Sequence, residues 1–413
     1  MHKKLQPILS ALSGRQILEA EACTGCGECV KLCPVYAIEP EERLTARGKI
    51  DLFKNLLRNE KPPLSFLLGN RSNPNFGIFQ DALWKCTVCG QCHFVCPARI
   101  DTPNLWEALR GMMGVGGYGP PQEQQEYLQI IKTHDNSFNQ PQAIRRTWLE
   151  QAYAEGQIME PVRNILEHPA PVLYFMGCTA TYDVTIRQVA LDTINVLQKA
   201  GIDFAVLGEN ELCCSGKMKR MGEVQFNERA RANIEQFNAL GIKTLVASCA
   251  GCYKTINEDY PKIAPLNFEV LHVSEMVHRL LQQKLIAFQR SLEVTTTYHD
   301  PCHLGRNCGV YEAPREVLKA IPGLQLVEME RNRQKAKCCG GGGGLKLVDH
   351  DLQIKASAAR LEDAEAIGAA MLTTPCPTCY LSLKKGQEFS NSPVELQHFM
   401  SIVRKALDLI GPA

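Results

Sequence analysis

Apolar residues recur every three or four positions in the first quarter of the 413-residue chain. This spacing is typical of amphipathic helices with one face in a core. It predicts a helix over residues 46–58, with Ile50, Phe53, Leu56 and Leu57 on one face, and a similar stripe that ends with Phe79, Leu83 and Trp84. We interpret both stripes as core packing in a helical N-terminal module.

From about residue 170 onward, short apolar runs alternate with helix-like stretches. The runs predict buried strands at residues 171–177, 204–207 and 244–248, and again at 295–298, 324–327 and 371–374. Residues 184–200, between the first two runs, have helical periodicity. Strands that alternate with helices imply parallel sheets. The predicted fold class is therefore α/β, with two tandem parallel-sheet units behind the helical module.

Composition adds one unusual feature, which is the cysteine content. Hydrophobic residues at 45% and charged residues at 22% are ordinary for a globular protein, but the chain has 19 cysteines. The N-terminus, Met1-His2-Lys3-Lys4, lacks the apolar core of a signal peptide. We therefore expect a cytoplasmic protein, in a reducing compartment where cysteines bind metal rather than pair as disulfides.

Eight cysteines form two copies of C-x2-C-x2-C-x3-C-P, the bacterial ferredoxin run that binds [4Fe–4S] clusters. The first ferredoxin run is Cys23, Cys26, Cys29 and Cys33, and the second is Cys86, Cys89, Cys92 and Cys96. In two-cluster proteins the fourth cysteine serves the other cluster. We therefore expect one cubane on Cys23, Cys26, Cys29 and Cys96, and another on Cys86, Cys89, Cys92 and Cys33. Structural zinc is the alternative, because C-x2-C is also a zinc signature, but two complete runs with a trailing Pro favour iron–sulfur clusters.

Ten more cysteines form an internal repeat. The first five-cysteine motif is Cys178, Cys213, Cys214, Cys249 and Cys252, and the second is Cys302, Cys338, Cys339, Cys376 and Cys379. Corresponding positions are 124, 125 and 127 residues apart, so two copies of one unit follow each other. The cysteines of each motif follow the carboxyl ends of predicted strands, where open α/β sheets bind ligands. Five converging thiolates are too many for zinc or for one plain cubane.

The spacings C-x34-CC-x34-C-x2-C and C-x35-CC-x36-C-x2-C resemble the duplicated cysteine-rich (CCG) domain of heterodisulfide reductases, and so does HDPCHLGR at residues 299–306. With the ferredoxin-like module in front, residues 15–105 and 170–410 resemble the D subunits of that family. The chain is also similar to the iron–sulfur subunit of glycolate oxidase. The resemblance implies that each five-cysteine motif holds a noncubane [4Fe–4S] cluster and that the two clusters cleave a disulfide between them. Both motifs are complete here, whereas many electron-transfer relatives have one incomplete motif.

Three functions remain open. The first is a heterodisulfide reductase-like subunit that relays electrons through two cubanes to two catalytic noncubane clusters, with a small-molecule disulfide as substrate. The second is an electron-transfer subunit, without its own substrate, of a flavin 2-hydroxyacid dehydrogenase or of a bifurcating or ring-reducing complex. A zinc-scaffold protein is the remote third reading. The two intact motifs favour the first.

The chain is expected to work with other redox subunits, of flavoprotein, iron–sulfur or cytochrome b type. No G-x-G-x-x-G follows a strand, so we expect no bound flavin or NAD. A net charge of +1 gives no electrostatic footprint for nucleic acid. No apolar stretch of about 18 residues is present to span a bilayer, so membrane association is expected only through a partner subunit.

The remaining features leave alternatives open. The glycine run that begins with Gly340 and Gly341 after Cys339 is expected to allow close backbone approach to a cluster or substrate, with a phosphate cradle as the weaker alternative. His299 and His303 flank Cys302 and either tune the cluster or protonate a leaving thiolate. Cys308, outside every motif, is expected to be buried.

The sequence divides into four expected parts. These are a ferredoxin-like domain at residues 1–110, a connector at 111–168, and CCG domains at 169–290 and 291–413. The connector opens with a loop rich in Gly and Pro and continues with helix-forming residues. It serves either as a clamp between modules or as a docking surface.

Overall fold

The computed structural model describes residues 12–58 and 74–409, which divide into two units. The first unit contains the described residues up to Glu126 together with two later segments, Lys217–Val224 and Lys337–Ser357. The second contains Tyr127–Gly216, Gln225–Ala336 and the residues from Ala358 onward. Each cysteine-rich repeat therefore contributes one segment, at or shortly after its Cys-Cys pair, to the first unit.

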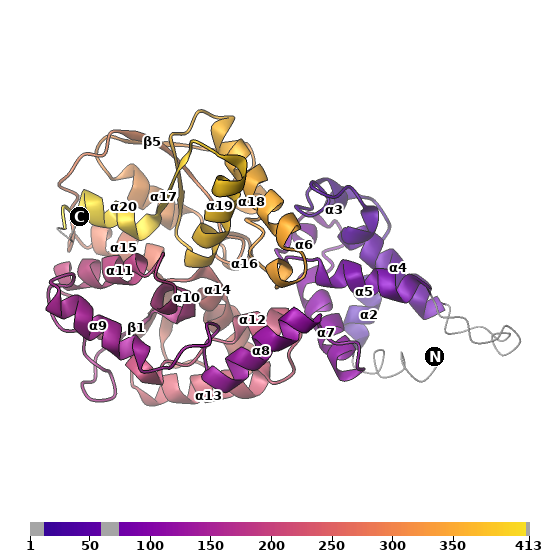
Figure 1. Cartoon of the computed structure of the whole chain (residues 1–413), viewed down its shortest axis with the longest axis horizontal. Helices are drawn as coiled ribbons and strands as arrows, with labels where there is room; N and C mark the ends of the chain where they lie inside the picture. Colours follow the sequence, from indigo (N-terminus) through magenta and orange to yellow (C-terminus); the bar gives the residue numbers. More distant parts are fainter. Residues whose placement is uncertain (1–11, 59–73, 410–413) are drawn as a thin grey trace, which may run out of the picture. The chain divides into compact units, whose positions relative to one another are not determined.

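The first unit is built from helices, drawn in indigo and purple in Figure 1. They are α2 (Gly14–Glu21), α3 (Glu28–Lys31), α4 (Ala46–Arg58), α5 (Pro74–Trp84), α6 (Gln91–Val95) and α7 (Thr102–Val115), with the 3-10 turn η1 (Glu42–Leu44). The predicted helix over 46–58 is confirmed as α4, and Ile50, Phe53 and Leu56 are buried in one core with Phe79 and Leu83. The side chain of Leu57 lies outside the described residues.

The second unit contains two four-stranded parallel sheets, which confirms the predicted fold class. The first sheet has the order β2-β1-β3-β4 and the second the order β6-β5-β7-β8. The strands are β1 (Val172–Phe175), β2 (Phe204–Ala205), β3 (Thr244–Ala247), β4 (Glu269–His272), β5 (Val294–Tyr298), β6 (Leu324–Val327), β7 (Met371–Thr374) and β8 (Glu395–His398). Register is equivalent in the two sheets, with Val172 opposite Thr244 and Thr296 opposite Met371.

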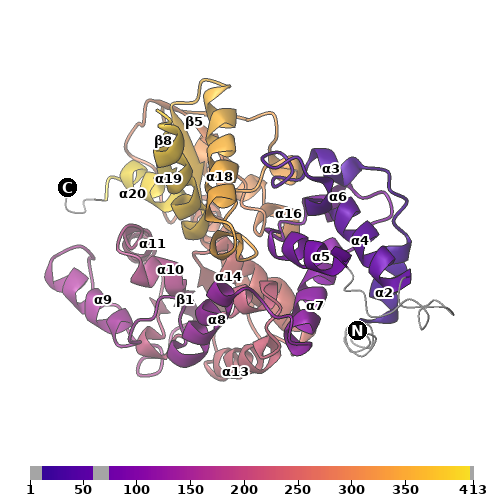
Figure 2. The ribbon, with the colours of Figure 1, turned by 45° about the vertical axis from the view of Figure 1, so that its right-hand side comes forward.

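Helices follow the strands in both repeats, with two α-helices after β2 but one after β6. The first repeat has α10 (Gly177–Tyr182), α11 (Gln188–Lys199), α12 (Gly216–Arg220), α13 (Phe226–Ala239), α14 (Ala250–Lys254) and α15 (Val273–Gln282). The second has α16 (Gly305–Cys308), α17 (Glu312–Lys319), α18 (His350–Glu365), α19 (Pro377–Ser390) and α20 (Phe399–Ala406). α19 packs against β7 and β8, and Figure 2 shows it beside β8.

The two repeats share one core. α11 of the first repeat packs against α20 of the second, and α15 of the first packs against α17 of the second (Figure 1). In both pairs, a helix that follows the last strand of one repeat meets a helix that precedes the second strand of the other. Apolar residues of both sheets, among them Tyr174 and Tyr298, belong to a single buried cluster. The repeats therefore form one folded body.

Several strand and helix boundaries differ from the prediction. The strand expected at 204–207 ends at Ala205, because Val206 pairs instead with the connector: its amide donates to the Arg163 carbonyl at 3.0 Å, and its carbonyl accepts from Ile165 at 2.8 Å. The run expected at 171–177 ends at Phe175, and the helix expected over 184–200 begins at Gln188. Before that helix, the Asp183 carboxylate accepts from the Thr185 amide in a local turn.

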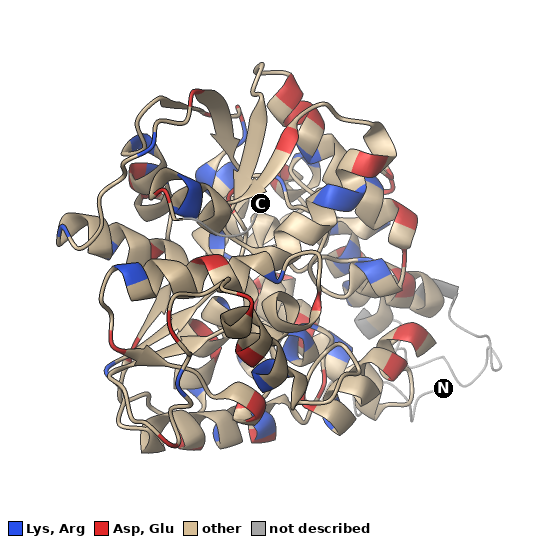
Figure 3. Cartoon of the chain, turned by 60° about the vertical axis from the view of Figure 1, so that its left-hand side comes forward, with Lys and Arg blue, Asp and Glu red and all other residues tan. Residues whose placement is uncertain are grey.

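The connector forms two helices, α8 (Gln122–His134) and α9 (Ile144–Ala154). Among the described residues, no helix is both long and apolar enough to cross a bilayer. Basic and acidic residues are interspersed along the ribbon in Figure 3, in keeping with a net charge of +1.

Candidate iron–sulfur centres

The two ferredoxin runs have the same backbone geometry. Helices α3 and α6 pack together, and each begins after a left-handed glycine, Gly27 with φ 84° and Gly90 with φ 76°. One residue of the first spacer is also left-handed in each run: Gly25 with φ 73° and Val88 with φ 53°. A β-branched residue is rare in this region and costs conformational energy. The strained turn lets the Val88 amide donate to Cys86 Sγ at 3.4 Å.

The cysteines of these runs gather in two groups. One cavity is lined by Cys23, Cys26, Cys29 and Cys96, together with Cys92. Cys33 lies instead beside Cys86 and Cys89. Burial raises the pKa of Cys33 to about 11, and the charges of those two neighbours add to the shift against the opposing charge of Lys49. The fourth cysteine of each run thus lies with leading cysteines of the other run.

The first five-cysteine motif converges within the second unit. Cys178 lies in α10, directly after β1, and Cys249 is the N-cap of α14, directly after β3. Cys178 hydrogen-bonds with Cys213, and Cys214 Sγ lies 3.3 Å from Cys252 Sγ. All five thiols are wholly or largely buried. Three loops therefore bring five sulfur atoms to one place.

Hydrogen bonds among the thiols lower the pKa of two of these cysteines. The pKa of Cys214 lies well below its usual range because Cys213 and Cys252 hydrogen-bond to its sulfur, and that of Cys249 is lowered by hydrogen bonds from Cys252 and Cys376. Thiolates are the form of cysteine that binds metal. The donor set, five thiols without a competing carboxylate among them, fits an iron–sulfur cluster.

The cysteines of the second five-cysteine motif are divided between the units. Cys302, Cys376 and Cys379 lie in the second unit, and Cys338 and Cys339 belong to the first. Within the second unit, Cys376 hydrogen-bonds with Cys249 of the first motif, and this contact is the largest cause of its raised pKa. The C-x2-C segments of the two repeats therefore adjoin.

His299 and His303 lie on the two sides of Cys302. The buried His299 ring accepts at Nδ1 from the Arg360 guanidinium, 3.3 Å away, and one of its ring nitrogens lies within 4.8 Å of Cys379 Sγ. His303 Nδ1 is 3.5 Å from the position that a Cβ would take on Gly251, which lies between Cys249 and Cys252. His303 therefore reaches the C-x2-C segment of the other repeat.

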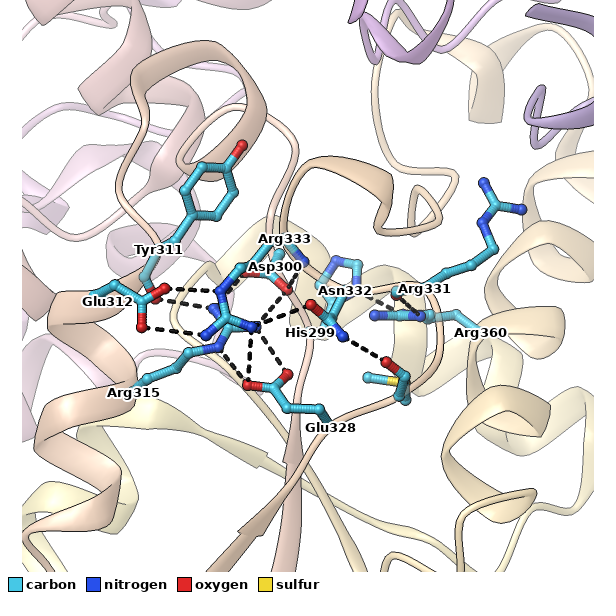
Figure 4. Close-up of polar contacts among 11 residues, drawn as sticks. His299, Asp300, Tyr311, Glu312, Arg315, Glu328, Arg331, Asn332, Arg333 and Arg360 are labelled. Atoms are coloured by element: carbon cyan, nitrogen blue, oxygen red, sulfur yellow. Dashed lines mark hydrogen bonds and ion pairs between the residues drawn. The ribbon is translucent and has the colours of Figure 1, made fainter. Parts of the chain in front are cut away.

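A charged network holds the loop before Cys302, as Figure 4 shows. The fully buried Arg315 guanidinium donates to both Asp300 oxygens, at 2.7 and 2.8 Å, and to Glu328. Asp300 also accepts from the Arg333 amide at 2.8 Å. A bidentate arginine–carboxylate pair adds geometric specificity to charge attraction. The HDPC segment is therefore held rigidly.

Sequence reasoning missed Arg145, a connector residue that reaches the first five-cysteine motif. Its guanidinium is fully buried, lies 3.7 Å from Cys178 Sγ and pairs with Glu211 at 2.5 Å. Glu211 in turn accepts from the Met176 and Gly177 amides, at the start of the Cys178 loop. The connector thus contributes directly to this site, and nothing in its composition indicated that contact.

The glycine run packs against backbone of the second ferredoxin run. A Cβ on Gly342 would lie 2.5 Å from the Thr87 carbonyl oxygen, and one on Gly343 would collide with the Cys86 carbonyl. Gly340 is similarly crowded by the Gln353 carbonyl, 2.7 Å from the Cβ position. Glycine is needed here because main chain meets main chain.

The expectation that Cys308 is buried is wrong. It is partly exposed at the end of the four-residue helix α16, where Gly309, with φ 76°, turns the chain away.

Comparisons with known proteins agree with this architecture. The cysteine-rich domain (CCG) family matches residues 172–257 and 296–384, and the 4Fe-4S dicluster domain family matches residues 19–100. The chain therefore contains a 4Fe-4S dicluster domain followed by two copies of the cysteine-rich domain.

Several known proteins are similar over most of the chain. The D subunit of the dihydromethanophenazine:CoB–CoM heterodisulfide reductase of Methanosarcina mazei is 36% identical over 407 residues, covering 96% of each chain. The EtfAB:quinone oxidoreductase of Syntrophomonas wolfei is 27% identical, over 90% of this chain and 56% of that protein. A crystal structure of a hypothetical protein from Helicobacter pylori shares the fold with a TM-score of 0.52 at 12% identity, over 88% of this chain and 73% of that one.

Proposed function

The chain belongs to the family of heterodisulfide reductase D subunits, and from that premise we propose that it reduces a small-molecule disulfide with electrons relayed through its own iron–sulfur centres. The observation that carries this proposal is the completeness of both five-cysteine motifs. Each motif offers five thiolates, one more than a cubane uses, which supports two sites that do more than relay electrons.

We propose four clusters. The cubanes are held by Cys23, Cys26, Cys29 and Cys96 and by Cys86, Cys89, Cys92 and Cys33, and the noncubane clusters by the two five-cysteine motifs. The proximity of Cys33 to Cys86 and Cys89 supports the exchange of fourth ligands between the runs. The convergence of five thiols around Cys214 and Cys252 supports the first noncubane site.

Disulfide cleavage consumes two electrons and two protons and yields two thiols, and iron–sulfur clusters supply electrons one at a time. The hydrogen bond between Cys249 and Cys376 joins the two repeats, so a disulfide bound there reaches both motifs. We propose that His303, next to Gly251, holds a proton for one leaving sulfur. The His299 ring accepts at Nδ1 from Arg360 and so carries its proton on Nε2, and we propose that this proton goes to the other leaving sulfur.

Electrons are proposed to enter at the first cubane, because Cys26 is exposed. The donor is a partner protein of flavoprotein, iron–sulfur or cytochrome b type, and any membrane attachment runs through that partner. The similarity to the EtfAB:quinone oxidoreductase favours a second candidate, a pure electron-transfer subunit.

Metal analysis tests the cluster assignment. We expect anaerobically purified protein to contain about sixteen irons per chain, four from each of four clusters, with an equal amount of sulfide. Stoichiometric zinc with little iron would contradict the proposal as a whole.

Paired cysteine variants separate catalysis from relay. Cys214→Ala and Cys339→Ala are each expected to lose one noncubane signal, to keep both cubanes reducible and to lose disulfide reduction with an artificial donor, since one cluster cannot supply both electrons at once. Loss of turnover in only one variant restricts catalysis to that site. An intact protein that transfers electrons to a partner but reduces no disulfide supports the second candidate.

A further inference from the structure

Arg110, in α7 of the first unit, is a fully buried arginine with an unusual set of partners. Its guanidinium donates to five carbonyl oxygens: Leu83 at 2.7 Å, Trp84 at 3.3 Å, Cys86 at 2.8 Å, Arg220 at 2.6 Å and Gly343 at 2.8 Å. It also lies over the Trp84 ring, 5.1 Å from the ring centre. Among the described residues no carboxylate pairs with it.

Those carbonyls come from three segments, each of which adjoins a set of cluster cysteines in the sequence. Leu83, Trp84 and Cys86 lead into the second ferredoxin run. Arg220 lies six residues after Cys214, and Gly343 lies four residues after Cys339. One side chain therefore joins the start of the second run to the segments that follow both Cys-Cys pairs.

Within the first unit, the two later segments are held in parallel ways. Each has an ion pair of its own, from Lys219 to Glu107 at 2.6 Å and from Lys85 to Asp349 at 2.9 Å. Each also has a left-handed glycine that meets backbone: a Cβ on Gly222 would lie 2.5 Å from the Arg110 carbonyl carbon. The tight fit of Gly343 against Cys86 is the counterpart in the second repeat.

A buried guanidinium without a carboxylate partner is costly, because carbonyl dipoles do not cancel its charge. Burial lowers the pKa of Arg110, and the nearby Cys86 thiolate and, after it, Glu107 oppose that shift. Glu107 is already paired with Lys219. Arginine nevertheless stays protonated in proteins. An iron–sulfur cluster with four thiolate ligands, bound at Cys86, would supply the negative charge that balances this cation.

We propose that Arg110 is a positioning residue for the second cubane: its charge is balanced by the cluster on Cys86, Cys89, Cys92 and Cys33, and its five hydrogen bonds lock the segments after both Cys-Cys pairs to that cluster's loop. The inference rests on the proposed assignment of this cubane. Because reduction adds a negative charge, a fixed cation raises the reduction potential of this cluster and leaves that of the first cubane unchanged.

Two substitutions separate the charge of Arg110 from its hydrogen bonds. In Arg110→Met both are lost, and we expect the second cubane to become about tenfold harder to reduce, a shift of about 59 mV for one electron. In Arg110→Lys the charge remains but the fork of donors is lost. We expect the equilibrium constant for reduction of the second cubane in this variant to stay within about twofold of the native value.

Hydrogen exchange measures the positioning role independently. Amides in segments 217–224 and 337–357 should lose protection in both variants, because lysine cannot contact all five carbonyls. Arg47→Met is the matched control: this partly exposed arginine donates to the Gly25 carbonyl at 3.2 Å in the first run. It should shift only the first cubane, and by less, since solvent screens it.

The measurement is a redox titration followed by electron paramagnetic resonance on iron-loaded protein. An unchanged second-cubane potential in Arg110→Met, or an equal shift of both cubanes, overturns the proposal. So does an Arg110→Lys variant with the Arg110→Met potential, or the failure of both variants to retain iron, which would make Arg110 a folding residue only. Native protein without iron at Cys86 would instead contradict the proposed function.

Discussion

Two histidines, His272 and His398, occupy equivalent positions at the ends of β4 and β8. Each accepts at Nδ1 from an amide in the first turn of the following helix, Ser274 in α15 and Met400 in α20. Both rings are buried, and burial lowers the pKa of His272 to about 4 and that of His398 to about 3. The two caps are therefore neutral at physiological pH.

Because these two helix-capping histidines are neutral in the folded protein, we expect the second unit to lose stability in acid. Since the folded pKa values lie below the value near 6.5 of an unfolded histidine, the unfolded chain binds more protons, and stability falls as pH drops below 6.5. At pH 5 each histidine is expected to cost ~2 kcal/mol of unfolding free energy. Thermal melts of the holoprotein between pH 5 and 8 test this, with the double variant His272→Asn/His398→Asn, which keeps a capping side chain but does not titrate. An equal acid slope in native protein and variant would contradict the assignment.

At the scale of elements, the glycines after the Cys-Cys pairs determine where backbone can meet backbone. Gly222 and Gly117 have almost the same left-handed conformation, with φ of 75° and 78°. A Cβ on Gly222 would collide with the backbone of α7, whereas one on Gly117 would have no atom within 4 Å. A comparison of substitutions at Gly117 and Gly222 therefore separates the cost of backbone strain from the cost of a steric collision.

Alanine at these two positions should give different results. Gly117→Ala is expected to cost ~1 kcal/mol, the usual penalty for a side chain in the left-handed region. Gly222→Ala adds a collision with backbone that cannot move freely, so we expect at least ~2 kcal/mol more and displacement of segment 217–224. Denaturant unfolding and hydrogen exchange of that segment measure both effects. Equal losses for the two variants would show that the close approach is unimportant.

At the scale of the whole molecule, the two repeats depend on each other through α11 and α20. Asp192, fully buried in α11, accepts from Ser401 at 2.7 Å and pairs with Arg404 at 2.7 Å, both in α20. Burial raises the pKa of Asp192, and its partners in α20 oppose that shift. This contact links helices that belong to different repeats.

Removal of that carboxylate should weaken both repeats together. Asp192→Ala leaves Arg404 without its partner and is expected to cost ~3 kcal/mol, with reduced iron at both noncubane sites and full occupancy of the cubanes. Glu269→Ala breaks the exposed pair with Arg279 and should cost under ~1 kcal/mol. Cluster-resolved spectra and unfolding curves give the comparison. Loss of iron at one noncubane site alone would mean that the repeats are stabilised independently.

Much of the architecture was determined by the sequence itself. The period of apolar residues located α4 and most strands, and the cysteine spacings indicated the duplicated unit, because these signals arise between residues that are neighbours in the chain. The edge strands β4 and β8 were not predicted. Each has only four residues and begins and ends with a polar one, as Glu269–His272 and Glu395–His398 show, and so short a run does not stand out.

Tertiary structure alone decided what surrounds the cysteines. Arg110 binds carbonyl oxygens of residues up to 233 positions away in the sequence. Because every residue has a backbone carbonyl, no residue type identifies these partners in the sequence. Arg145 reaches Cys178 from a connector of ordinary composition. The five-glycine run was recognisable as a place of close approach, but only the fold determined that it packs against Cys86 and Thr87. Ligand spacing is a local property of the chain, whereas the charges and backbone contacts around a ligand come from segments that only folding brings together.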